Sequence, residues 1–361
     1  MKSYTVKIHI ITPLIIHSGE FYSIFELLPT KDGKSIMLID FNKAFNFMSQ
    51  KEREQFFSIM DTLVADIKKD KEKLLRARSI LQNVALQNLD VIIQRVQAHP
   101  QFIQGVDSNP YAIIYKIFKD ELSMKPYIPG STLKGALRTA LLESLRKKNN
   151  MYPNVKLFKN NKPKNFQSTD FEMQIMKKDT NAIFDIGLDP FRFMKVSDLM
   201  FKNQTVLLDT VRIIGKGKQQ KGIPIYTEMS ASHYINKDEC IAEGEITIDE
   251  DGLKKFVNNY KLGDFLNIEF IMKSLMDFNL EILNNKKHPI DPKVKENITT
   301  VCNSNELIPL RLGRFTQIES KTFKIKQKKA IPPEVNLYGG VSRSLIRGEI
   351  PAGWCGLKIQ N

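Results

Sequence analysis

The chain has 361 residues, more than a typical single domain, so we expect two domains. Its 54 Lys and Arg against 40 Asp and Glu give a net charge of +14, which favours a polyanionic partner over a basic protein without one. The three cysteines are far apart and form no CxxC pair, which argues against a disulfide framework and a zinc site. Without a signal-peptide or membrane-spanning pattern, the sequence predicts a cytoplasmic protein.

The first hundred residues alternate between strand and helix patterns. Apolar residues at every second position predict a strand over 4–10, which meets a loop at 15–20. A short strand is expected at 35–39, and Asp40 is then placed to cap a helix over 41–57. Residues 61–98 carry apolar side chains at helical spacings. We therefore expect a helical insertion at about 43–100 that lies outside any sheet.

The rest of the chain begins with a clear helix and continues mainly as strands. Residues 132–148 predict a helix. Strands are expected at 192–196, 205–214, 223–228 and 240–248, helix over most of 253–285, and strand and loop in the tail. Because there is no long run of βαβ units, we predict an α+β fold with antiparallel sheets. The expected domains are residues 1–200, with the helical insertion, and residues 201–361.

The most informative segment is Tyr127–Thr139, with the sequence YIPGSTLKGALRT. Ser131 or Thr132 is placed to cap the helix that follows Pro129–Gly130. Lys134 then falls near the helix start, where a cation opposes the helix dipole unless an anion is bound there. Arg138 projects from the same face, and Gly135 allows another backbone to come close. These features predict a phosphate site that serves ligand binding rather than folding; the alternative is an ordinary amphipathic helix.

The segment is not a nucleotide-triphosphate loop. Gly130 and Gly135 have the GxxxxG spacing of a Walker A motif, but Ala136 and Leu137 follow where that motif needs Lys and then Ser or Thr.

Other basic segments offer further phosphate contacts. The loop 215–222 carries Lys216 and Lys218 between glycines, a basic run begins at Lys321, and Arg343 follows a Gly-Gly turn. Contacts of this kind position a nucleic-acid backbone without reading its sequence. The alternative for each is a solvated charged surface.

Catalysis has one candidate residue. His17, beside Ser18–Gly19, is placed for acid–base chemistry on RNA, but a histidine at a strand end is more often structural. Asp40 and Asp198 would hold a metal only if the fold brought them together. We therefore expect no catalytic residue, no metal and no cofactor.

The segment 127–139 resembles the IPGSSLKGALRT signature of the RAMP superfamily, the RRM-like proteins of CRISPR complexes. Further segments resemble the same superfamily in order along the chain: TPLIIHSGE at 12–20, KVSD at 195–198, PIYTE at 224–228, LGR at 312–314 with SKT at 320–322, and PAGWC at 351–355. Together they are most similar to the fifth subunits of type III-A CRISPR effector complexes. The late loop departs from the pattern, because it has one glycine where the family often has more.

The resemblance implies two ferredoxin-like domains with glycine-rich loops. It implies a non-catalytic subunit that binds the CRISPR guide RNA, caps the backbone filament near the guide 3′ end, contacts the backbone RAMP subunit, and supports antiviral defence and guide maturation by host nucleases. A RAMP endoribonuclease that uses His17, or a module that recruits nucleases and subunits, are the alternatives. The predicted RNA contacts are His17, Ser18, Gly19, Gly130, Ser131, Thr132, Lys134, Gly135, Arg138, Lys216, Lys218, Arg314, Lys321 and Arg343.

Overall fold

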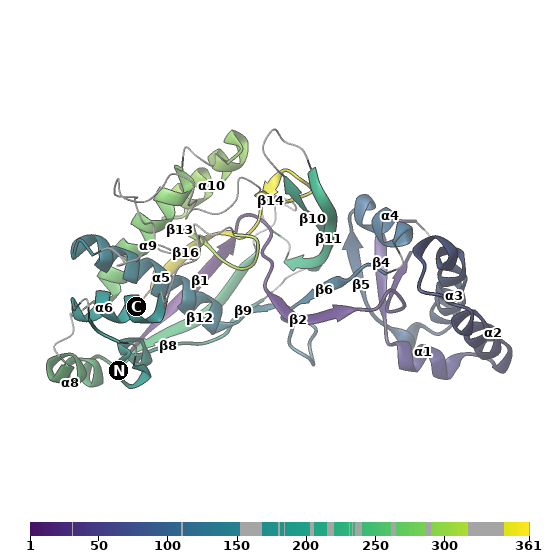
Figure 1. Ribbon diagram of the computed structural model, residues 1–361, viewed down its shortest axis with the longest axis horizontal. Helices are drawn as coiled ribbons and strands as arrows, with labels where there is room; N and C mark the ends of the chain where they lie inside the picture. Colours follow the sequence, from purple (N-terminus) through teal and green to yellow (C-terminus); the bar gives the residue numbers. More distant parts are fainter. Residues whose placement is uncertain are drawn as a thin grey trace, which may run out of the picture.

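A computed structural model describes most of the chain. The described residues are 1–30, 32–109, 111–151, 168–179, 181–183, 185–202, 206–214, 220–230, 232, 234, 240–260, 265–285, 290–316 and 343–360. Two sheets with helices packed on them make up the molecule (Figure 1).

The first sheet has seven strands and joins the two ends of the chain. Its order is β13-β16-β1-β12-β9-β7, and β8 also pairs with β12. These strands are β1 (Lys2–Ile10), β7 (Tyr127–Ile128), β8 (Met194–Val196), β9 (Leu199–Phe201), β12 (Ile241–Ile248), β13 (Ile308–Arg311) and β16 (Trp354–Gln360). All its pairings are antiparallel. The predicted alternation of β1 is confirmed, since Tyr4, Val6, Ile8 and Ile10 are buried.

Helices gather around this first sheet (Figure 1). They are α5 (Gly130–Lys148), α6 (Ser168–Lys177), α8 (Glu250–Tyr260), α9 (Ile268–Leu283) and α10 (Pro292–Ser304), with short 3-10 turns at Ile186–Leu188 and Pro190–Phe193. Helix α5 packs on α9 and β8. Helix α10 corrects the expectation of strand and loop in the tail. Its signal was present: Asp291 caps it, and Val294, Ile298 and Cys302 recur every four residues and are buried.

The second sheet has nine strands and is mixed. Its order is β2-β6-β11-β10-β5-β4-β3, and β14 pairs with β10 and β15. The strands are β2 (His17–Tyr22), β3 (Leu27–Pro29), β4 (Ser35–Ile39), β5 (Ile92–Ala98), β6 (Ile114–Ile117), β10 (Val206–Ile214), β11 (Gln220–Ser230), β14 (Arg343–Ile346) and β15 (Ile350–Pro351). Strands β5 and β6 pair in parallel with β10 and β11, respectively. The expectation of purely antiparallel sheets is therefore corrected for this sheet.

The expected insertion contains a strand as well as helices. Its helices are α1 (Phe41–Phe47), α2 (Gln50–Asp61), α3 (Ile67–Gln87) and α4 (Pro100–Ser108), with a 3-10 turn at Leu89–Val91. Asp40 caps α1 as predicted, but the single helix over 41–57 is two helices because Ser49 and Glu52 form a capping box that starts α2. Residues 92–98 are β5, paired with β4, rather than helix outside a sheet.

Each sheet takes strands from both sides of residue 200. In the first sheet β1 lies between β12 and β16, and in the second β10 and β11 pair with β5 and β6. The predicted division into residues 1–200 and 201–361 therefore does not follow the sheets. Helices α1–α4 lie at the end of the molecule opposite α5, α8 and α9, with β2 and β6 running between (Figure 1).

Candidate nucleic-acid interface

A groove of about 480 Å³ lies where three segments distant in the sequence meet. The start of β2, the first turns of α5 and the loop after β13 form its walls. Its lining residues are Ile16, His17, Thr132, Gly135, Ala136, Thr139, Arg311, Leu312, Gly313, Arg314 and Thr316. The structure thus brings together four of the predicted RNA contacts: His17, Thr132, Gly135 and Arg314.

The loop after β13 is fixed by close backbone packing. The Arg314 N–H donates to the Ile15 carbonyl at 2.7 Å, and the Leu312 N–H donates to the Gly353 carbonyl at 2.8 Å. Gly313 has a φ of +85°, and a Cβ there would lie 2.5 Å from the Ile15 carbonyl oxygen. Only glycine combines that backbone conformation with that approach. The single glycine of this loop is therefore what lets the loop reach the N-terminal segment.

His17 is held on both ring nitrogens. Nδ1 lies 2.8 Å from Arg314 Nη1, and Nε2 lies 2.9 Å from Thr227 Oγ1. Because a guanidinium can only donate, Nδ1 must accept, which assigns the proton to Nε2. The ring also stacks on Tyr115, with centroids 4.8 Å apart and planes 8° from parallel. Burial, followed by the charge of Arg314, lowers the His17 pKa to about 4.

The low pKa of His17 predicts a pH-dependent contribution to stability. Between its ordinary pKa of 6.5 and about 4, the unfolded chain binds a proton at His17 that the folded chain does not bind. Stability from this residue is therefore full above pH 6.5 and decreases as the pH falls through that window. In chemical denaturation at several pH values, His17→Gln should lose less stability than the parent between pH 6.5 and 4. Equal losses in the two proteins would contradict the assignment of a neutral His17.

The start of α5 is capped by a distant carboxylate. The Gly130 N–H donates to Asp198 Oδ1 at 2.8 Å, and Pro129 occupies the capping position without a side-chain bond. The expectation that Ser131 or Thr132 caps the helix is therefore wrong, because the helix already begins at Gly130. A Cβ on Gly130 would collide with the Val196 carbonyl oxygen. The turn after β8 thus occupies the position where a phosphate was expected to meet the first N–H group.

Lys134 and Arg138 are engaged within the protein. Lys134 Nζ donates to the Met194 carbonyl at 2.7 Å, and burial lowers the Lys134 pKa. Arg138 forms ion pairs with Glu172 and Asp189, each at 2.7 Å. We expected these two residues to contact RNA and to contribute nothing to folding. The second expectation is wrong, because both side chains bond segments that neighbour α5. Their contact with RNA stays a prediction.

Gly135 presents open space to the groove. A Cβ at this position would meet no atom within 4 Å, although glycine costs helix stability here. The absence of a side chain leaves the helix backbone accessible from the groove. The close approach of another backbone at this position stays a prediction.

Ser18 and Gly19 lie in β2 beyond the groove. The Ser18 hydroxyl donates to the Lys116 carbonyl at 3.4 Å and accepts the Glu20 N–H at 3.3 Å. Gly19 has a φ of +96°, in the bulge where the β2–β6 register shifts. They shape β2 next to His17, and their contact with RNA stays a prediction.

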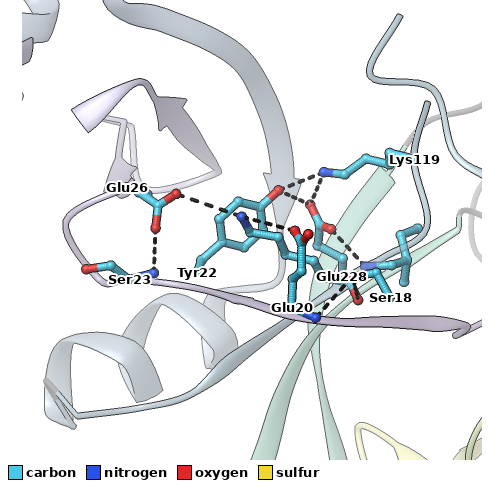
Figure 2. A network of polar contacts seen from close by, with 9 residues as sticks. Ser18, Glu20, Tyr22, Ser23, Glu26, Lys119 and Glu228 are labelled. Atoms are coloured by element: carbon cyan, nitrogen blue, oxygen red, sulfur yellow. Dashed lines mark hydrogen bonds and ion pairs between the residues drawn. The ribbon is translucent and has the colours of Figure 1, made fainter. Parts of the chain in front are cut away.

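A buried polar network joins β2, β6 and β11 behind His17. Figure 2 shows Tyr22, Lys119 and Glu228 pointing toward one another. Glu228 is fully buried, and its Oε1 accepts from the Tyr22 hydroxyl at 2.8 Å and from Lys119 Nζ at 2.7 Å. Its Oε2 accepts the Ile117 N–H at 3.1 Å. The network fixes the strands that carry His17 and Tyr115.

The structure does not describe the side chains of four predicted RNA contacts. Lys216, Lys218 and Lys321 lie outside the described residues, and Arg343 is described only as the first residue of β14, paired with Ile214. The sequence alone did not identify three residues that lie in the groove or against His17: Tyr115, Arg311 and Phe315. The run of β-branched and aromatic residues over 113–117 is a strand signal that covers Tyr115, but it does not predict which strands lie beside it.

The described residues contain neither a metal-binding cluster nor a membrane-spanning helix. No group of three or more His, Cys, Asp and Glu there is arranged to hold a metal ion. Within the same part of the chain, no helix combines the length and apolar character that crossing a bilayer requires.

Comparison with known proteins points to one family. The model of the RAMP superfamily matches residues 7–316. The "CRISPR system Cms protein Csm5" of Methanocaldococcus jannaschii is 32% identical over 195 residues, which cover 54% of this chain and 42% of that protein. The chain therefore spans less than half the length of this curated relative.

Two solved structures share the fold over nearly the whole chain. One is a chain of the cryo-EM structure of a Csm–crRNA–target RNA ternary complex of a type III-A CRISPR-Cas system, with a TM-score of 0.66, 18% identity, and coverage of 98% of this chain and 100% of that one. The other is the crystal structure of T. onnurineus Csm5, with a TM-score of 0.59, 17% identity, and coverage of 97% and 99%.

Proposed function

Because this chain belongs to the RAMP superfamily, we propose that it is a non-catalytic subunit of a type III-A Csm complex that binds the CRISPR guide RNA in the groove beside α5. The observation that carries the proposal is the convergence of His17, Thr132, Gly135 and Arg314 on that groove. A polyanion fits there, since Arg314 lines the groove and Gly135 leaves room for a backbone.

The finer assignment follows from the relatives. Similarity to a chain of a Csm–crRNA–target RNA complex over 98% of this chain, and to proteins named Csm5, supports a fifth-subunit role at the end of the backbone filament near the guide 3′ end. There it would contact the backbone RAMP subunit and support guide maturation by host nucleases. The order β16-β1-β12-β9, with α5 and α9 as crossovers, supports a ferredoxin-like domain.

The state of His17 supports the absence of catalysis. A general base must be free to accept a proton from the substrate hydroxyl, whereas His17 accepts from Arg314 and donates to Thr227. Purified protein incubated with guide precursor, with or without EDTA, is therefore expected to leave the RNA intact. Cleavage that survives repurification and is lost in His17→Ala would establish the endoribonuclease alternative instead.

Gly135→Ala tests the groove by separating stability from binding. An alanine in this helix position should raise the free energy of unfolding by about 0.5–1 kcal/mol. The same methyl group projects toward the groove, so RNA affinity should fall, by about 1 kcal/mol if one backbone contact is lost. Thermal melting and RNA titration at fixed salt measure the two effects. A variant that is more stable and binds RNA as well as the parent would place the RNA elsewhere.

Arg314→Gln tests the charge of the same groove. For single-stranded RNA, the slope of log affinity against log salt is about −0.7 per neutralised phosphate. Loss of the Arg314 charge should therefore make the slope less steep by about 0.7. Lys51→Gln, which removes an exposed charge on α2, is the matched control and should leave the slope unchanged. Equal slopes in all three proteins would contradict binding in this groove.

A further inference from the structure

An exposed aromatic residue lies beside the groove on the second sheet. The register pairs Phe21 of β2 with Tyr115 of β6, and Tyr115 with Thr227 of β11. Residues paired in this way lie side by side on one face of a sheet. Phe21 is 61% exposed, and Ile113, two residues before Tyr115, is 53% exposed. The face therefore presents an apolar strip, Phe21–Tyr115–Ile113, which we call the aromatic strip.

The aromatic strip continues directly from the groove. His17 lines the groove and stacks on Tyr115. The Arg314 guanidinium, also in the groove wall, lies 5.4 Å from the Tyr115 ring centroid. A strand whose backbone follows the groove past Arg314 and His17 thus reaches Tyr115 and then Phe21, its neighbour across the strands.

The charges around the aromatic strip fit a nucleic acid better than a protein. Glu20 and Tyr22 flank Phe21 in β2, and Glu228 follows Thr227 in β11, so strand alternation directs them to the opposite face. There Glu228 bonds Tyr22 and Lys119 (Figure 2). Asp209 of β10 pairs with Thr227 and so lies on the same face as the aromatic strip, but it is buried and forms an ion pair with Arg347.

We propose that Phe21 and Tyr115 stack an unpaired base of the RNA whose backbone lies in the groove, an inference that rests on the proposed function. Aromatic rings stack on any base, because every base presents a π-face. The strip would therefore orient the strand without selecting its sequence. Removing the Phe21 ring should weaken RNA binding about tenfold, similarly for unrelated sequences.

The test is a scan of single-stranded RNA oligonucleotides that carry 2-aminopurine at one position each. Stacking on an aromatic ring should change the probe fluorescence at one or two adjacent positions on addition of the full-length protein. Phe21→Ala should abolish that change and weaken binding, while Phe21→Trp should keep both. Leu89→Ala, at a residue with 62% exposure on the distal 3-10 turn, is the matched control and should behave like the parent.

The possible outcomes distinguish failure of base stacking from failure of the proposed RNA-binding function. Salt-dependent RNA binding with no position-specific change in fluorescence would overturn the stacking and leave the proposed function standing. No RNA binding at low salt would overturn both. Loss of association with another Csm subunit in Phe21→Ala, with RNA affinity and fluorescence unchanged, would assign the strip to a protein partner and overturn the proposal.

Discussion

Replacing Glu228 by alanine should lower the free energy of unfolding by about 3–5 kcal/mol, the usual cost of removing one partner from a buried ion pair. Glu228 is fully buried, and the side chain of its partner Lys119 is 7% exposed. Without the carboxylate, the Lys119 ammonium keeps, among the described residues, the hydroxyl of Tyr22 at 2.7 Å and the ring of the same residue. The Ile117 N–H loses the bond that it donates to Glu228. An unpaired buried charge is far less favourable than a hydrated one.

A double-mutant cycle distinguishes the effect of leaving the Lys119 charge unpaired from the effect of lost packing. Adding Lys119→Met to Glu228→Ala should recover part of the lost stability, because no buried charge is then left unpaired. Tyr22→Phe removes two hydrogen bonds, one donated to Glu228 and one accepted from Lys119, but leaves the ion pair, and should cost less, about 2 kcal/mol. Urea denaturation measures the parent, the three single variants and the double variant. If Lys119→Met added its own loss to that of Glu228→Ala in full, the network would not be a coupled unit.

Replacing Arg138 by alanine should cost about 2–4 kcal/mol of stability. Arg138 donates from Nε and Nη2 to Glu172 and from Nη1 to Asp189, and its guanidinium lies 4.5 Å from the Phe191 ring centroid. The three charged side chains are about a fifth exposed, so the pairs are less screened than surface pairs and less costly to lose than fully buried ones. The variant leaves two carboxylates without their shared cation.

The matched control for Arg138 is its exposed neighbour Arg192. The only hydrogen bond described for its side chain is a long one to the Gly187 carbonyl, at 3.4 Å, so Arg192→Ala should change stability by less than about 1 kcal/mol. Thermal melting compares the two variants, and RNA titration of the folded fraction reports any direct contact. An Arg138→Ala protein that melts with the parent and binds RNA more weakly would restore the phosphate role inferred from the sequence.

Local patterns in the sequence were sufficient to predict the elements that are determined by neighbouring residues. The alternation of Tyr4, Val6, Ile8 and Ile10 identified β1, and Asp40 identified the start of α1. The segment after Pro129 identified α5, and the scattered superfamily segments identified the RAMP family that the matching model shows. For β1, α1 and α5 the residues that decide the structure lie within a few positions of one another.

The contacts of the candidate site residues were decided by the tertiary structure alone. From residues 127–139, Arg138 looked available to a phosphate, but its carboxylate partners are 34 and 51 positions away. Asp198, which caps α5, is 68 positions from Gly130. The groove likewise depends on Arg314 reaching His17, 297 positions earlier. Charge and hydrogen bonding depend on distance in space, and a single sequence gives the periodicity of its elements but not which distant elements become neighbours.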